Sequence, residues 1–125
     1  MPKLIAIAVA GAAGSLSRYW LGGWISHHLG PRFPFGTVGV NILGCLAIGL
    51  IGTLADEKFL ISPAVRLPII IGFLGAFTTF SSFSYETWIL IKDGEFLLGG
   101  LNVVGSLLGC FLGLALGVIL GRLFG

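Results

Sequence analysis

The side chains whose types and spacing could do chemistry are concentrated in residues 72–86, which read GFLGAFTTFSSFSYE. Glycines and hydroxyls crowd the middle of an otherwise apolar stretch there. A helix that breaks near Gly75 would free backbone carbonyls, and carbonyl oxygens are ligands for hard cations. Threonine and serine hydroxyls can instead bond back to carbonyls four residues earlier in an unbroken helix. The residues alone leave both interpretations open.

Three phenylalanines in this stretch, Phe77, Phe80 and Phe83, recur every three residues and are expected to share one side of a helix. An aromatic ring is positive at its edge, so such a row could line the path of an anion without carrying charge. A row of this kind is more often plain core packing. The polar residues beside the row are Ser81, Ser84 and Glu86.

Composition places these residues in a membrane protein. Hydrophobic residues make up 56% of the 125 residues and charged residues only 10%, against about 45–50% and about 25% in soluble domains. So few charges cannot cover a water-facing surface. The net charge of +2, without a basic cluster, excludes a nucleic-acid partner. Cys45 and Cys110 lie in apolar stretches with no CxxC pair, so we expect packing roles rather than a disulfide or a metal site.

Residues 1–125 form one predicted domain of four transmembrane helices, because a helix needs about 20 apolar residues to cross a bilayer. The third segment is longer than a bilayer requires. We expect it to break near mid-membrane, where irregular backbone is tolerated only if protein or a polar cavity surrounds it. The predicted spans are 4–25, 36–55, 67–91 and 96–123.

Basic residues orient these spans only weakly. With four spans, both termini and the middle loop share one side, which carries four basic residues against two on the other. Cytoplasmic loops normally show a clear excess. The near balance predicts insertion in both orientations, and therefore pairing with an inverted copy in a dual-topology homodimer. The residues counted are Lys3, Lys58, Arg66 and Arg122 on the first side, and Arg32 and Lys92 on the second.

Three polar side chains inside or beside the spans could act on an ion. Asn41 either bonds a neighbouring helix or offers its amide N–H groups to an anion. Arg18 is expected to extend toward the membrane surface rather than line a pore, although its charge at a vestibule would attract anions. Glu86, one turn beyond Ser82, is expected near the surface and within reach of the hydroxyls.

Glycine recurs every fourth residue through the fourth predicted span, at 105, 109, 113, 117 and 121. Such a face has no side chains, so another helix can approach it closely, as is usual for helix association in lipid. Packing inside one chain and packing between two chains are equally compatible with the pattern.

These residues together resemble one known family. Residues 75–86 closely resemble the third-helix signature of the CrcB/Fluc fluoride channels. Residues 34–41, PFGTVGVN, are similar to the second-helix motif of that family, and residues 11–19 to the start of its first helix. Departures from residues frequent in the family are Ala76, Ser82 and Asn102.

The resemblance implies a passive fluoride exporter of the bacterial inner membrane, built as an antiparallel homodimer with two pores, that lowers fluoride toxicity. It implies that Asn41 is the pore amide and that Phe80 and Phe83 present ring edges to fluoride. The carbonyls of Gly75 and Thr78 from both subunits would hold a structural sodium ion (Na+) at the dimer centre. The polar approaches would be lined by Thr37, Ser81, Ser84, Glu86 and Ser106, with Arg18 at the vestibule.

Two other functions stay open on the residues alone. A small dual-topology multidrug transporter has a similar length, but it needs a membrane-embedded carboxylate and the first span has no Asp or Glu. The glycine pattern by itself would also fit a non-conducting membrane assembly subunit. No nucleophile–base pair and no metal-ligand cluster is recognisable, so the sequence does not predict an enzyme.

Overall fold

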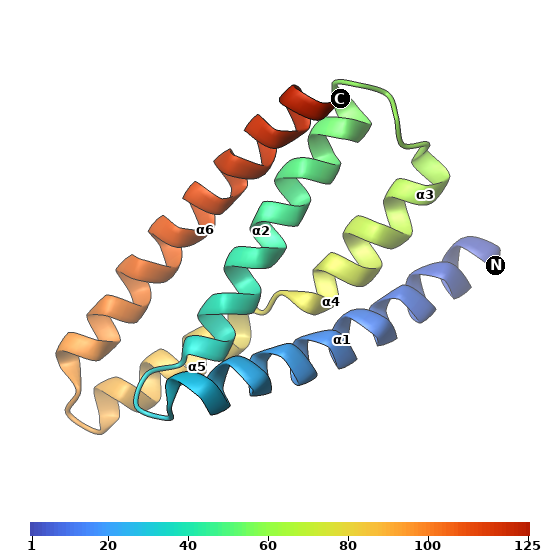
Figure 1. Cartoon of the computed structure of the whole chain (residues 1–125). Coiled ribbons are helices and arrows are strands. Elements are labelled where there is room, and N and C mark those ends of the chain that lie inside the picture. Colours follow the sequence, from blue (N-terminus) through green and yellow to red (C-terminus); the bar gives the residue numbers. More distant parts are fainter.

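The structure, a computed structural model, describes all 125 residues and is entirely helical. Four helical stretches are long and apolar enough to cross a membrane, which confirms the predicted number of spans (Figure 1). The first, second and fourth stretches are single helices, whereas the third consists of four shorter pieces in succession. The elements are α1 (Pro2–Leu29), α2 (Phe35–Asp56), α3 (Pro63–Leu67), the π-helix η1 (Pro68–Leu74), α4 (Gly75–Phe77), α5 (Phe80–Lys92) and α6 (Phe96–Phe124).

Proline and glycine set several of the element ends. α1 ends at Leu29, and the Gly30 that caps it has a φ of 94°, in the left-handed region that glycine adopts without strain. Pro63 begins α3 at a position where a missing N–H costs nothing. Pro68 has no N–H to continue the hydrogen-bond ladder of α3, and the wider turns of η1 follow it.

A two-residue link without helical backbone separates α4 from α5. Thr78 has φ −93° and ψ 157°, and Thr79 has φ −152° and ψ 113°, so both residues are extended. The helix restarts at Phe80, where the Thr79 Oγ1 caps it by accepting a hydrogen bond from the Ser82 N–H at 3.1 Å. Figure 1 shows this Thr78–Thr79 link as a thin connection beside α2.

α2 and α6 pack backbone against backbone. A Cβ atom added at Gly117 would overlap the carbonyl oxygen of Leu46, and one added at Gly49 would overlap the carbonyl oxygen of Leu114. Only glycine permits such an approach, and close approach is what holds helices together in lipid. The glycine ladder of α6 therefore packs inside the chain, except at Gly105, which faces open space.

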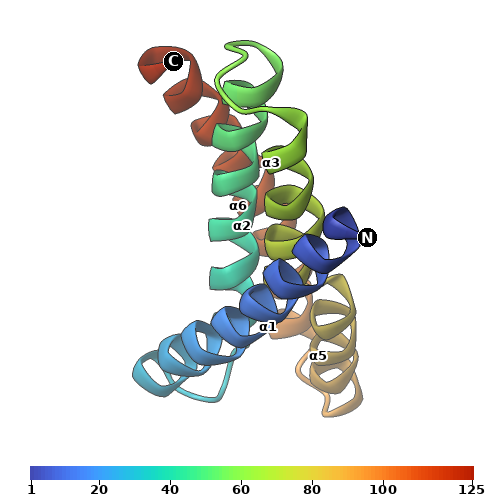
Figure 2. The same cartoon turned by 90° about the vertical axis from the view of Figure 1, so that its right-hand side faces the viewer.

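α1 crosses the other helices obliquely and uses the same kind of contact (Figure 2). Gly14 of α1 lies against the carbonyl of Phe73 in η1, and Gly36 of α2 lies against the carbonyl of Gly22 in α1. A side chain at Gly14 or Gly36 would separate the helices. These contacts hold α1 beside the third stretch, within reach of α4.

A single chain leaves most of its apolar side chains on its surface. Only 18 of 125 residues are buried, and the exposed side chains include Trp20 and Phe111. An apolar surface of this extent is stable only against lipid or against another apolar protein surface.

Both termini lie at the same end of the molecule as the loop between α2 and α3. Arg122, near the C-terminus, donates to Glu57 at 3.0 and 3.1 Å, and Lys3 and Arg66 line one cavity of about 960 Å³. The hydrogen bond from Arg122 holds the pKa of Glu57 below its usual value. This ion pair therefore contributes stability above the unfolded pKa of a glutamate and loses it as the pH falls through the lowered folded value.

Candidate functional site

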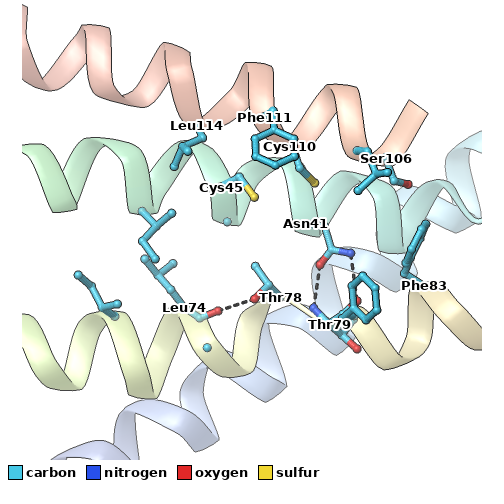
Figure 3. A pocket seen from close by; sticks show the side chains of 16 residues that line it. Asn41, Cys45, Leu74, Thr78, Thr79, Phe83, Ser106, Cys110, Phe111 and Leu114 are labelled. Carbon is cyan, nitrogen blue, oxygen red and sulfur yellow. Dashed lines mark hydrogen bonds between the residues drawn. The ribbon is translucent and has the colours of Figure 1, made fainter. Parts of the chain in front are cut away.

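Three of the four spans meet at one cavity. It has a volume of about 400 Å³ and lies between α2, the third stretch and α6 (Figure 3). Its wall is mostly apolar, with a few hydroxyl, amide and thiol groups, and no acidic or basic side chain lines it. The predicted site residues that line it are Asn41, Gly75, Thr78, Phe80, Phe83 and Ser106.

Asn41 fastens the Thr78–Thr79 link to α2. Its Oδ1 accepts a hydrogen bond from the Thr79 N–H at 2.7 Å, and its Nδ2 donates to the Thr79 carbonyl at 3.1 Å (Figure 3). Because Thr79 is not helical, both of its backbone groups would otherwise be unpaired in apolar surroundings, at a high cost. The amide has two hydrogens and commits one to Thr79, so one donor remains.

The link leaves two carbonyls without hydrogen bonds from the helix. The carbonyl of Gly75 would normally accept from the Thr79 N–H, which Asn41 now occupies. The carbonyl of Thr78 accepts no hydrogen bond. Free carbonyl oxygens suit hard cations, so the backbone at both predicted metal positions fits such an ion. The Thr78 side chain has another partner, because its Oγ1 donates to the Leu74 carbonyl at 3.0 Å.

Arg18 reaches this region from α1. Its Nε donates to the carbonyl of Ala76 in α4 at 3.0 Å. The prediction that Arg18 extends toward the membrane surface is wrong, because a carbonyl near the end of α4 offers an acceptor inside the bundle. Arg18 does not line the cavity itself, so its charge lies beside the cavity.

The row of three phenylalanines is divided by the link. Phe80 and Phe83 pair on α5, with ring centroids 5.4 Å apart and ring planes at 52°, and both line the cavity. Phe77 is buried and stacks on Phe73 at 5.8 Å. The prediction of one common side is wrong, because two extended residues redirect the chain between Phe77 and Phe80. Phe80 is 74% exposed and Phe83 only 8%, so one ring of the pair points outward from the chain.

Three predicted polar residues do not line the cavity. Ser81 is exposed on α5, with its Oγ 3.3 Å from the Thr79 Oγ1. Ser84 donates back to the Phe80 carbonyl at 3.0 Å, one of the two interpretations that the residues left open. Thr37 is half-buried on α2.

Glu86 is half-buried on α5, and its Oε1 is enclosed without a hydrogen-bond partner. The expected hydrogen bonds from the neighbouring hydroxyls to Glu86 are not formed in the structure. Nearby hydroxyls donate instead to carbonyls of their own helix, as Ser84 and Thr87 do. Glu86 is also outside the cavity lining.

A buried polar network beside the cavity was not predicted from the sequence. Thr87 donates to the Phe83 carbonyl at 2.8 Å, and Asn102 donates to the Thr87 Oγ1 at 2.8 Å. Ser106 donates to the Asn102 Oδ1 at 3.2 Å. The network joins α5 to α6, and Asn102 is 1% exposed. The available signal was the spacing of Asn102 and Ser106, one turn apart in an apolar span.

Comparison with known proteins identifies the family. A sequence model of the family described as CrcB-like protein, Camphor Resistance (CrcB), matches residues 5–118. The chain belongs to the CrcB family. The resemblance carried by residues 75–86 is thereby confirmed, and the cavity lies within the matched region.

CrcB relatives match nearly the whole chain. A protein of Geotalea uraniireducens (strain Rf4) is 49% identical over 110 residues, which is 88% of this chain and 89% of the relative. Proteins of Geotalea daltonii (48% over 110 residues, 88% and 89%) and Solibacter usitatus (49% over 105 residues, 84% and 86%) are similar. Each is named fluoride-specific ion channel FluC. With its four apolar helices, this CrcB chain is a multi-pass protein of the bacterial plasma membrane.

We expect the buried network to stabilise the contact between α5 and α6. Thr87→Val and Asn102→Leu should each lower the free energy of unfolding in detergent, because each leaves a buried polar partner unpaired. The double-mutant cycle should give a coupling energy of about 0.6 kcal/mol and at most about 1.7 kcal/mol, as for interhelical hydrogen bonds in membrane proteins. Strictly additive losses would mean that the two side chains do not interact.

Proposed function

We propose that this CrcB-family chain forms a channel that conducts fluoride passively across the membrane, lowering its concentration in the cytoplasm. The observation that carries the proposal is the cavity between α2, the third stretch and α6, where neutral hydrogen-bond donors and two phenylalanine rings come together. Relatives over 88% of the chain are named fluoride-specific ion channels. A proton-coupled drug transporter would need an acidic side chain in such a cavity, and none lines it.

The cavity suits an anion because its polar groups can act as donors. Asn41 keeps one amide hydrogen free after bonding Thr79. α5 begins at Phe80, so the N–H groups of its first turn lack partners in the helix and carry partial positive charge; of these, the Ser82 N–H is taken by the Thr79 cap. The ring edges of Phe80 and Phe83 are also positive. Neutral donors hold an ion weakly enough for it to leave, which conduction requires.

The proposal predicts selective fluoride flux that depends on the cavity. In liposomes loaded with fluoride or chloride, the protein should release fluoride rapidly and retain chloride, as followed with ion-selective electrodes. Asn41→Asp should slow fluoride efflux by at least about tenfold, or about 1.4 kcal/mol in the barrier, because it replaces a donor by a negative charge. Phe80→Ile should slow efflux similarly, because it removes a ring edge.

A matched control is Phe124→Ile, which makes the same change at an exposed position near the C-terminus, outside the cavity. Its efflux should equal that of the unaltered protein. The absence of fluoride efflux from liposomes that contain well-folded protein would overturn the proposed function. Unchanged efflux in Asn41→Asp would mean that Asn41 has only a structural role.

We propose that the channel is an antiparallel homodimer whose third span breaks near mid-membrane. Several observations support this: the Thr78–Thr79 link lies midway between Pro63 and Lys92, Phe80 points outward from the chain, and basic residues are nearly balanced between the two sides. A second copy would cover the outward-facing apolar surface and complete the wall around the cavity. The exposed hydroxyls of Ser81 and Ser84 would then line approaches to the pore together with Thr37, Glu86 and Ser106.

Dual topology is tested with reporters fused to the C-terminus. A reporter active only in the cytoplasm and one active only outside it should both give signal, because the chain inserts in both orientations. Lysines added at one end change the balance of basic residues between the two sides of the membrane. They should suppress one of the two signals and at the same time reduce fluoride efflux. A single orientation in the unaltered chain would exclude the antiparallel dimer.

We further propose that the carbonyls of Gly75 and Thr78 hold a sodium ion shared by the two chains. The support is that neither carbonyl receives the hydrogen bond that an unbroken helix would supply. A bound cation would supply positive charge beside the cavity, and Arg18, through Ala76, would hold α4 in place next to it.

The sodium proposal predicts an ion-specific stability. Protein purified with N-methylglucamine in place of sodium should melt at a lower temperature, and added sodium should restore the melting temperature in a saturable way, since a ligand of the folded state stabilises it. Potassium at equal ionic strength is the control and should restore less. Equal effects of sodium, potassium and N-methylglucamine would exclude a specific site.

A further inference from the structure

The proposed function makes no use of the two thiols in the cavity. Cys45 on α2 and Cys110 on α6 are the only cysteines of the chain, both are free, and both line the 400 Å³ cavity. Figure 3 shows their sulfur atoms in the space where α6 meets α2. The helices that carry them touch near these positions, because a Cβ atom at Gly113 of α6 would lie 3.7 Å from the Leu46 amide nitrogen of α2. The expectation that each is only a packing residue does not explain why both thiols open onto the same cavity.

The helix contact around Cys45 and Cys110 keeps the two backbones that carry the thiols together. A Cβ atom at Gly113, one turn beyond Cys110, would come within 3.1 Å of the Ile42 carbonyl. One turn beyond Cys45, Gly49 allows no side chain against the Leu114 carbonyl. Glycine contacts therefore hold the two backbones that carry the cysteines against each other, and a ligand that needs two sulfur atoms finds both on the wall of one cavity.

We propose that Cys45 and Cys110 form a two-coordinate site for a divalent thiophilic metal ion, for which the mercuric ion is the probe. Thiol sulfur is a soft ligand and selects soft metals. Binding replaces the two S–H bonds by two S–Hg bonds and releases two protons, so that Hg²⁺ and two thiolates form a neutral unit. A neutral unit suits this cavity, because uncompensated charge is costly in apolar surroundings.

The net charge of the bound unit and the number of available ligands disfavour other ions. A monovalent soft ion bound by two thiolates would leave a net negative charge in the cavity, which an apolar wall disfavours. Zinc normally takes four ligands, and no histidine, aspartate or glutamate lines the cavity to complete its shell. The site therefore favours a divalent ion that is satisfied with two sulfur ligands.

The consequence for transport rests on the proposed function. Asn41 and Phe83 line the same cavity as the two thiols, so a bound ion occupies space beside the proposed fluoride path. A mercuric ion would also tie α2 to α6 across the cavity. Binding should therefore inhibit fluoride flux, and the binding itself can be measured without any flux.

The binding test uses the purified, reduced full chain in detergent, titrated with mercuric chloride against a competing thiol. The ultraviolet absorbance of the mercury–thiolate bond should saturate at one ion per chain. Intact mass should rise by one mercury less two hydrogens, and both thiols should become unreactive toward maleimide together. Cys45→Ser and Cys110→Ser, which keep the shape and remove one sulfur, should each weaken binding by more than about 100-fold, beyond the effect of losing an outer-shell partner.

Three binding results would overturn the site: two ions per chain, mercury that joins two chains, or single variants that bind as tightly as the unaltered protein. For flux, mercuric chloride should inhibit fluoride efflux, and dithiothreitol should restore it. The double variant should be insensitive when each protein is compared with its own untreated rate. Saturated binding without inhibition would refute the effect on transport, whereas absence of any fluoride flux would refute the proposed function and leave the binding result valid.

Discussion

The structure depends on how one unwound residue is hydrogen-bonded in a region without water. Thr79 has extended backbone, so its N–H and carbonyl cannot enter a helical ladder, and the Asn41 side chain pairs with both. An asparagine amide can serve both groups because it carries a donor and an acceptor side by side. Without that pairing, the desolvation cost of two free backbone groups would favour a continuous helix.

The consequences of that pairing extend in both directions along the third stretch. Toward the N-terminus, the Gly75 and Thr78 carbonyls are released from helical bonding. Toward the C-terminus, α5 starts afresh at Phe80 with its own cap on Thr79, so Phe80 and Phe83 point in a different direction from Phe77. One hydrogen-bonded pair thus separates a carbonyl-rich region from an aromatic one.

Close helix packing gives this region its rigidity. Backbone contacts through Gly49 and Gly117 bring α2 against α6, and Gly14 brings α1 against η1. Side chains from separate helices can therefore reach the backbone of the third stretch, as Arg18 does at the Ala76 carbonyl and Asn41 at Thr79. The cavity lies between α2, the third stretch and α6, and the proposed second copy would complete its wall.

The sequence determined that the protein lies in a membrane, how many spans it has and which family it belongs to. These follow from properties that do not depend on tertiary structure: the scarcity of charge, the length of the apolar stretches and a long local signature. It also predicted six of the residues that line the cavity, because the family motifs specify which residue type stands at each position. It did not give the partners of those residues. The α6 glycine ladder, for example, is compatible by its sequence with packing inside or between chains. The close approach of the Leu46 carbonyl to Gly117 shows that it packs inside the chain.

Only the tertiary structure decided the partners, because hydrogen bonds in this chain join residues far apart in the sequence. Helical periodicity placed Phe77 with Phe80 and Phe83, but a link held by Asn41 from another helix broke that period. Arg18 has its acceptor in α4 and does not extend to the membrane surface. Asn102 bonds Thr87, a partner on another helix that the one-turn spacing of Asn102 and Ser106 does not identify. Cys45 and Cys110 line one cavity for the same reason: glycines on α2 and α6 set how closely the two helices approach, and the sequence of one helix does not determine that distance.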